Sequence, residues 1–346
     1  MLRTPIALAL VTACLVATGP TQGPAQAVPA VGAGTPAPSL AAALPLTGFA
    51  YGGLPRATLR RDAPALTTVT VDGVGLAADG RAVSQPDETV VGLGRSARAK
   101  GLRTELLVHN FSDGLGDFDP RRAHRLLSDP GAIARVSTQL ADLVDAGGWD
   151  GVNVDLELVA AGDAAGLVAL CRALQDALPA DGTVTIDISA ADSPSGYRQH
   201  GYDLRALAAV VDRIELMTYD EHGPGWSEPG AVGGLRWQRE AVRALLRVVP
   251  ADQVDLGTAA YGYAWRDGHQ GRGSTLSPAL ARATARRAGV RPVWHAGVAE
   301  WSARLPGGTV VWWADARSLR HRAALARELG VHGLALWRLG PADPLV

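Results

Sequence analysis

The stretch Gly148-Trp149-Asp150-Gly151-Val152-Asn153-Val154-Asp155-Leu156-Glu157 alternates polar residues with branched apolar ones and ends in a carboxylate. This alternation is typical of a β-strand, in which successive side chains point to opposite faces. Asn153, Asp155 and Glu157 therefore share one face of the predicted strand. Burying unpaired charges is costly, so an amide and two acids on one face require a functional reason. This row is the leading candidate for an active site.

Strand-like runs recur along the chain with helical runs between them. Leu, Ala and Val at helical spacing predict helices over residues 122–146, 164–178 and 238–249. Alternation of this sort predicts an α/β fold with a parallel sheet, and eight strands predict closure into a (β/α)8 TIM barrel within residues 46–346. The expected strands are 48–51, 68–74, 106–111, 152–157, 184–189, 213–219, 254–260 and 333–337.

One segment does not fit this repeat. Residues 261–315 are too long for a single crossover, and they hold short β-like stretches such as 309–313. We interpret the segment as a small α+β insertion after the seventh strand that forms one wall of a cleft. The alternative is a long seventh crossover with ordinary core tryptophans. The tryptophans concerned are Trp265, Trp294, Trp301, Trp312 and Trp313.

The first residues have the pattern of a secretion signal. Arg3 supplies a positive charge, residues 6–17 form a short apolar core, and Ala25-Gln26-Ala27 offers a small-residue cleavage site, so residues 1–27 are predicted to be a signal peptide. The apolar run is too short to span a bilayer. A lipoprotein anchored at Cys14 is the alternative. Residues 28–45, rich in Ala and Pro, are predicted to be a linker, and the mature protein is expected to be extracellular.

Composition narrows the possible partners. A formal net charge of -1 argues against nucleic acid, which usually demands a basic face. After cleavage only Cys171 remains, so we expect no intramolecular disulfide and a buried apolar role for this thiol. The protein is also expected to be a monomer. The histidines lack metal-ligand spacing, so neither metal nor cofactor is expected. Magnesium at Asp155-Leu156-Glu157 is the alternative, but no Gly-rich phosphate loop accompanies these acids.

Reactive groups of such barrels collect at the carboxyl ends of the strands. Glu157 and Tyr219 end the fourth and sixth predicted strands, and Asp155 is expected about 6 to 7 Å below Glu157. A buried acid beside another carboxylate has a raised pKa, as a proton donor requires. Further candidates for sugar contact are Tyr51, Asn110 and His222. For Tyr51 and Asn110 the alternative is a core or rim role, and for His222 plain solvent exposure.

The stretch Asp150-Gly151-Val152-Asn153-Val154-Asp155-Leu156-Glu157 resembles the fourth-strand signature of glycoside hydrolase family 18, the chitinase-like barrels. Asn153 replaces the usual middle Asp. Together with Met217-Thr218-Tyr219-Asp220-Glu221-His222 and Gly333-Leu334-Ala335-Leu336-Trp337-Arg338-Leu339-Gly340, it resembles the branch of spore-cortex and cell-wall glucosaminidases. The resemblance extends from about Gly48 to the carboxyl end.

The resemblance implies hydrolysis of a β-1,4 bond next to N-acetylglucosamine, with the acetamide of the substrate as nucleophile, an exception to the two-carboxylate scheme. Glu157 would be the general acid and base. Asp155 would hold the acetamide nitrogen and Tyr219 its oxygen. Asp220 would contact the central sugar and Trp337 would form the floor beneath it.

In the same scheme Asn153 joins the substrate-binding set as the hydrogen-bond donor that fixes Asp155, and its lack of charge is expected to alter the pH profile. Peptidoglycan is expected in preference to chitin because of the branch that the motifs resemble. A catalytically silent, lectin-like glycan-binding barrel and a structural wall protein are the alternatives. The presence of Glu157 argues against the first.

Overall fold

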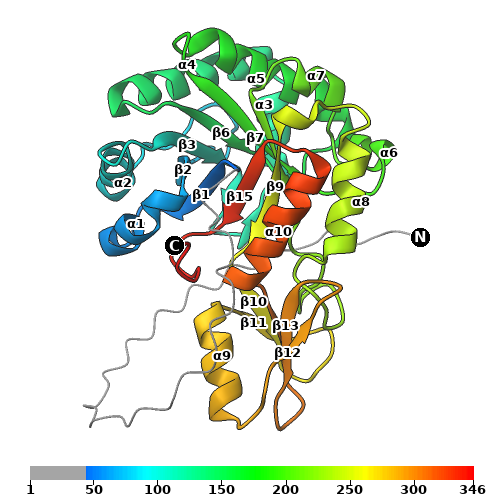
Figure 1. Ribbon diagram of the computed structural model, residues 1–346. Helices are drawn as coiled ribbons and strands as arrows, with labels where there is room; N and C mark the ends of the chain where they lie inside the picture. The colour runs from blue at the N-terminus through cyan, green and yellow to red at the C-terminus, as the bar shows by residue number, and fades with distance from the viewer. Residues whose placement is uncertain (1–43) are drawn as a thin grey trace.

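The computed structural model describes residues 44–346, and these fold around a closed parallel barrel (Figure 1). The predicted signal peptide and residues 28–43 of the predicted linker lie outside the described residues. The strands follow one another around the barrel in the order β1-β15-β9-β8-β7-β6-β3-β2, which confirms the predicted (β/α)8 fold. Their bounds are β1 (Leu46–Tyr51), β2 (Thr68–Gly75), β3 (Arg103–His109), β6 (Gly151–Asp155), β7 (Thr183–Ser189), β8 (Arg213–Met217), β9 (Val254–Ala259) and β15 (Gly333–Trp337).

Helices surround the barrel on its outer face (Figure 1). Outward apolar residues of the strands, such as Val152 and Val154, are fully buried against them. Cys171 lies in this layer, as predicted, and burial raises the pKa of its thiol to about 12. The helices are α1 (Arg56–Asp62), α2 (Glu88–Arg98), α3 (Pro120–Leu127), α4 (Pro130–Gly147), α5 (Ala164–Ala177), α6 (Pro194–Gln199), α7 (Leu204–Ala208), α8 (Leu235–Leu245), α9 (Pro278–Arg287) and α10 (Ala316–Leu329).

The helix predicted over residues 122–146 is in fact two helices, α3 and α4. Pro130 cannot continue a helix because it lacks an amide proton and its ring clashes with the preceding turn. It instead occupies the first turn of α4, where Asp129 caps the helix by accepting a hydrogen bond from the amide of Gly131. The prediction of helical structure was therefore correct, and the prediction of a single continuous helix was wrong.

Four strands, β3, β6, β8 and β9, end earlier than predicted, and two of them lead to catalytic candidates. β6 ends at Asp155 and β8 at Met217, so Glu157 and Tyr219 each lie two residues beyond the barrel ladder. After β6 the chain turns sharply at Leu158, whose φ is 57°. After β8 the amide of Thr218 bonds the carbonyl of Leu216 at 2.8 Å, which tightens the backbone out of the strand. Both side chains consequently rise from the rim on turns.

The predicted insertion after the seventh barrel strand is confirmed. It is an antiparallel sheet in the order β11-β10-β14-β13-β12 with helix α9, gathered at one end of the barrel (Figure 1). This separate five-stranded sheet excludes a plain crossover, and Trp265 and Trp313 are fully buried in it. The strands are β10 (Gly262–Trp265), β11 (Gly273–Leu276), β12 (Val293–His295), β13 (Glu300–Arg304) and β14 (Val310–Trp313). A short hairpin of β4 (Phe111–Ser112) and β5 (Asp117–Phe118) follows β3 and was not predicted.

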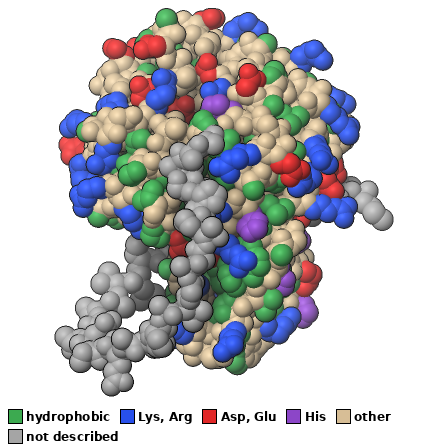
Figure 2. All heavy atoms as spheres, viewed as in Figure 1, with side chains coloured by type: hydrophobic (Ala, Val, Ile, Leu, Met, Phe, Trp, Pro, Cys, Tyr) green, Lys and Arg blue, Asp and Glu red, His purple; other side chains and the backbone are tan. Residues whose placement is uncertain are grey.

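Basic and acidic side chains are interspersed on the face that Figure 2 shows, in keeping with the balanced charge of the chain. Across the described range 44–346, every helix is too short or too polar to cross a membrane.

Candidate active site

The ends of β6 and β8 bring Asp155, Glu157 and Tyr219 together at the carboxyl end of the barrel. Asp155 is 7% exposed, whereas Glu157 and Tyr219 are half-buried. Burial is the largest cause that raises the pKa of Tyr219 well above its ordinary value. The next causes are the negative charges of Asp187, Asp155 and Glu157. An effect of this kind requires the groups to be close in space. The three predicted catalytic side chains thus share one site.

Asn110 fixes the position of Glu157 through the backbone. Its Oδ1 accepts from the amide of Glu157 at 2.9 Å, and its Nδ2 donates to the carbonyl of the same residue at 2.9 Å. Nδ2 also donates to the carbonyl of Asp119 at 3.0 Å. Asn110 is fully buried, which favours the core role over sugar contact. Both ends of its amide are occupied in clamping the turn that carries Glu157.

The environment of Glu157 favours its protonated form. Burial raises the pKa of Glu157 to about 8, with further contributions from the negative charges of Asp220, Asp187 and Asp117. Burial also raises the pKa of Asp155 well above its usual range, and the charges of Glu157 and Asp187 raise it further. Burial and neighbouring negative charges thus favour the neutral form of both acids. A protonated Glu157 at the rim is suited to donate a proton.

Asp220 is held by two tyrosines of the insertion. Its Oδ1 accepts from the hydroxyls of Tyr261 at 2.5 Å and Tyr263 at 2.7 Å, and its backbone has a φ of 62°. Burial raises the pKa of Asp220 to about 6, although both hydroxyls lower it. We did not predict these tyrosines. The alternation of Tyr261-Gly262-Tyr263 directly after the seventh strand is the signal that could have indicated them.

Trp337 and Tyr51 meet on the other side of the mouth, at the ends of β15 and β1. Both are half-buried, and their rings meet edge to face with centroids 6.0 Å apart. The guanidinium of Arg338 lies 4.2 Å from the ring centre of Tyr51. Trp337 also packs beside the cluster that contains Tyr261 and Tyr263. A flat indole at this position suits a sugar-binding floor, and that role stays a prediction.

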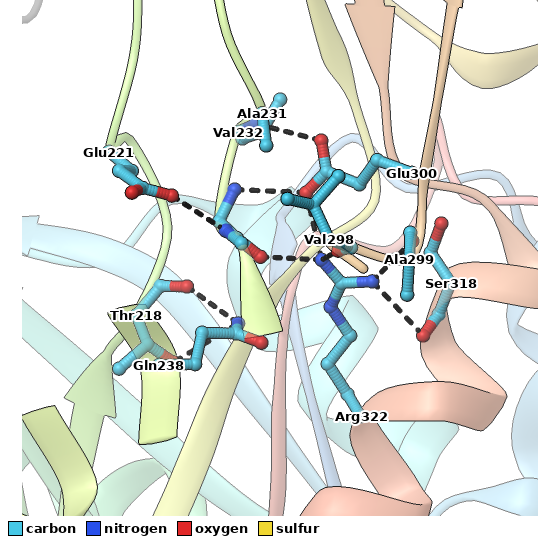
Figure 3. Close-up of polar contacts among 12 residues, drawn as sticks. Thr218, Glu221, Ala231, Val232, Gln238, Val298, Ala299, Glu300, Ser318 and Arg322 are labelled. Carbon is cyan, nitrogen blue, oxygen red and sulfur yellow. Dashed lines mark hydrogen bonds and ion pairs between the residues drawn. The ribbon is translucent and has the colours of Figure 1, made fainter. Parts of the chain in front are cut away.

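The loop between β8 and α8 is fastened to the insertion by a buried ion pair. Arg322 of α10 donates to Glu300 of β13 at 2.8 Å and to the carbonyl of Gly233, and both side chains are almost fully buried (Figure 3). Glu300 in turn accepts from the amides of Val232 at 2.7 Å and Gly233 at 2.9 Å. This pair orders the loop that begins with Asp220.

His222 lies in the same loop. Its Nδ1 is 2.9 Å from the carbonyl of Ala231, and 35% of its side chain is exposed. This contact closes the loop on itself, and substrate contact by His222 stays a prediction.

Asn153 does not act as predicted. It is fully buried, so it cannot contact a substrate. Its Nδ2 lies 3.0 Å from Thr185 Oγ1, 3.2 Å from Asp187 Oδ1 and 3.2 Å from Glu215 Oε2, and the structure shows no hydrogen bond from it to Asp155. Asp187 and Glu215 were not predicted. They belong to a layer of buried acids below the rim together with Glu105.

Among residues 44–346, His, Cys, Asp and Glu side chains do not gather in threes in a way that could hold a metal ion. The expectation of a site without metal or cofactor stays a prediction.

Comparison with known proteins identifies the family of this barrel and its acidic rim. The profile of Glycosyl hydrolases family 18 matches residues 116–342, which include Asn153, Asp155, Glu157, Tyr219, Asp220 and Trp337. The chain therefore belongs to glycosyl hydrolase family 18 and, as a member of this family, is a glycosidase.

Two curated relatives come from Bacillus subtilis. An uncharacterized glycosylase, YvbX, is 27% identical over 252 residues, covering 70% of this chain and 73% of the relative. A cortical fragment-lytic enzyme is 26% identical over 254 residues, covering 70% of this chain and 56% of the relative. The chain thus spans little more than half of the second enzyme.

Solved structures share the same fold. A chitinase from Chromobacterium violaceum has a TM-score of 0.77 at 28% identity, covering 88% of this chain and 96% of that protein. The spore cortex-lytic enzyme SleL of Bacillus cereus has a TM-score of 0.78 at 21% identity, covering 87% of this chain and 72% of that protein. The second likeness concerns the fold alone.

Proposed function

We propose that this protein hydrolyses β-1,4 bonds next to N-acetylglucosamine, with retention of configuration and with the acetamide of the substrate as nucleophile. The observation that carries the proposal is the pairing of Glu157, whose pKa burial raises to about 8, with the adjacent buried Asp155 at the barrel mouth. A raised pKa keeps the proton on Glu157 near neutral pH, where it can be donated. Membership of family 18 supports the same activity.

In the first step Glu157 donates its proton to the glycosidic oxygen. The bond from C1 to that oxygen breaks while the acetamide carbonyl oxygen attacks C1, which gives a cyclic oxazolinium and leaves Glu157 ionised. In the second step Glu157 takes a proton from water as the water oxygen attacks C1 and the ring opens. Two displacements at C1 retain its configuration.

Asp155 and Tyr219 stabilise the intermediate. The oxazolinium nitrogen is cationic, and a neighbouring carboxylate in a site with little water stabilises it strongly. Asp155 Oδ1 is buried and has no hydrogen-bond partner among the described residues, so it is free for that nitrogen. The raised pKa of Tyr219 keeps its hydroxyl protonated, so it can donate to the acetamide oxygen and hold it in line.

We propose peptidoglycan as the preferred polymer. The support is the resemblance of the Asn153-containing motif to the cell-wall branch, together with the cortical fragment-lytic relative. The similar chitinase makes chitin the polymer to test beside it.

We also propose that residues 1–27 direct export and are removed. Sequencing the amino terminus of protein recovered from the culture medium tests this proposal. A start at Val28 is expected. A membrane-bound form that begins at lipidated Cys14 contradicts it.

The experiment for the activity uses the protein lacking residues 1–27, a fluorogenic N-acetylglucosamine oligomer and purified peptidoglycan. Glu157→Gln is expected to lower kcat by about 10²–10⁴-fold, because it removes the proton donor at nearly constant shape. Glu88→Gln, at the exposed start of α2, is the matched control.

Three results contradict the proposal. Binding without turnover by the parent protein selects a lectin, and absence of both binding and turnover selects a structural role. An inverted first product, read from the anomeric proton signal, excludes the acetamide mechanism.

A further inference from the structure

Two acids that the mechanism above does not use face each other inside the barrel. Asp187 of β7 and Glu215 of β8 are directly opposite in the parallel register, 4% and 2% exposed. Neighbouring strands are about 4.8 Å apart, so the two carboxyls start from adjacent positions. Among residues 44–346 the ion pairs include neither acid.

Asn153 joins both acids. Its Nδ2 lies 3.2 Å from Asp187 Oδ1 and 3.2 Å from Glu215 Oε2. In the reverse orientation the amide oxygen would face the carboxylate oxygens, and two acceptors cannot bond each other. The network therefore places the NH₂ group of Asn153 toward the acids. Nδ2 is also 3.0 Å from Thr185 Oγ1, whose hydroxyl donates to Glu105 Oε2 at 3.0 Å. One amide therefore connects the acids of β3, β7 and β8.

Two buried carboxylates this close, with no ion-pair partner among residues 44–346, cannot both be ionised. We propose that Asp187 and Glu215 share one proton and, with Asn153, act as a positioning pair that sets the charge of the catalytic site above them. The inference rests on the proposed hydrolase function, because it assigns the pair to that reaction.

The pair reaches the catalytic side chains through Asp187. Its charge acts on Asp155, Glu157 and Tyr219, in each case raising the pKa. Burial raises the pKa of Asp187 itself to about 7, and it hydrogen-bonds Glu215. Asp187 is thus placed to influence every step that moves a proton.

Three other acids face the pair from other strands of the barrel. Glu105 of β3 accepts hydrogen bonds from three threonine hydroxyls, Asp155 of β6 lies above, and Asp255 of β9 pairs with His332 at 2.7 Å. Glu105 and Asp255 each raise the pKa of Glu215 further. All of them are negative when ionised, so they favour the shared proton.

The direction of the effect follows from Coulomb's law. A single negative charge on the pair makes Glu157 and Asp155 harder to deprotonate and extends the proton-donor form of Glu157 to higher pH. Removal of that charge moves the basic limb of the pH profile of kcat/KM to lower pH. Replacing one acid by its amide leaves one charge and one hydrogen bond, whereas replacing both removes the charge.

The test compares Asp187→Asn, Glu215→Gln and the double variant on the fluorogenic oligomer. The double variant is expected to move the basic limb down by about one to two pH units, the usual effect of a close charge. Each single variant is expected to move it by less than about half a unit. Asp62→Asn, a fully buried acid in α1, is the matched control for loss of a buried carboxylate.

An unmoved limb in a folded double variant overturns the proposal. Single variants whose shifts add up to the shift of the double variant overturn it too, because the pair would then carry two charges.

The ¹³C-carboxyl resonance of Asp187 in the parent, assigned by its absence from Asp187→Asn, gives a second measurement that requires no double variant. We expect it to be partly protonated near pH 6, and a fully ionised resonance there overturns the pair. This reading holds even if the parent shows no turnover, so failure of the hydrolase proposal and failure of the pair are distinguished.

Discussion

Restoring the carboxylate that the family signature usually has at position 153 tests the interior of the barrel directly. Asn153→Asp replaces the amide that lies within 3.2 Å of Asp187 and Glu215 by an acceptor of the same size. The shape of the core is retained, so the change isolates hydrogen bonding and charge.

The expected cost in the free energy of unfolding follows from the lost contacts. A hydrogen bond to a charged group contributes about 1.5–3 kcal/mol, and Nδ2 has two carboxyl neighbours. If the new carboxyl keeps a proton it can replace one of these bonds, so we expect a loss of about 2–3 kcal/mol at neutral pH.

This loss depends on pH with a definite sign. Burial beside two acids raises the pKa of the new carboxyl above its unfolded value of about 3.9, so the folded state binds more protons. The variant therefore loses stability as pH rises through that interval, and its deficit is smaller at pH 5 than at pH 8.

Urea unfolding of the parent, Asn153→Asp and Asn153→Ala at pH 5 and pH 8 measures this effect. Asn153→Ala loses the same hydrogen bonds but adds no charge, so its deficit should change less with pH. The pH profile of kcat/KM should also differ between Asn153→Asp and the parent. Equal stability at pH 8, or superimposable profiles, refutes the reasoning.

Three further outcomes follow from the structure. Asn110→Ala frees the turn that carries Glu157 and is expected to lower kcat by about 10–100-fold with a smaller change in KM, measured by steady-state kinetics. Arg322→Met leaves Glu300 buried without its partner and should cost about 3–5 kcal/mol in urea unfolding, whereas a neutral result would contradict the anchoring role. The pKa values of Asp220 and Glu157, about 6 and about 8, lie above their unfolded values, so the parent should lose stability between pH 5 and pH 8. The loss should be smaller in Asp220→Asn, and an unchanged pH dependence of stability in that variant would contradict the raised pKa of Asp220.

The barrel could be predicted because its strands repeat a local pattern. Branched apolar residues alternate with polar ones in β6, and helical spacing follows in α5, so period alone distinguishes the elements. The insertion stood out for the opposite reason, since residues 261–315 lack the repeat. Strand ends were less predictable. The turn at Leu158 and the tightened backbone at Thr218 are set by contacts that no local pattern reports.

The site was predictable where side chains belong to one strand and not where they meet across several. Asp155 and Glu157 share a face by parity alone. The neighbours of Asn153 depend on barrel register, which places Thr185 opposite it and Glu215 opposite Asp187. Asn153 was therefore predicted to donate to Asp155, its neighbour on the same strand. In the structure its amide donates to acids on two other strands.

This rearrangement explains how an amide can occupy a position where the family usually has an acid. A carboxyl group at position 153 would be a third acid against Asp187 and Glu215, whereas the amide supplies the donor that those two acceptors need. The charge absent from position 153 is thus present one strand further on, at Asp187, where it still acts on Asp155 and Glu157. If that view is correct, the double variant Asn153→Asp with Asp187→Asn should lose less stability than the sum of the two single losses. Its barrel interior would again hold two acids at these three positions, as in the parent. Additive losses in the double variant would show that the two positions do not share the charge.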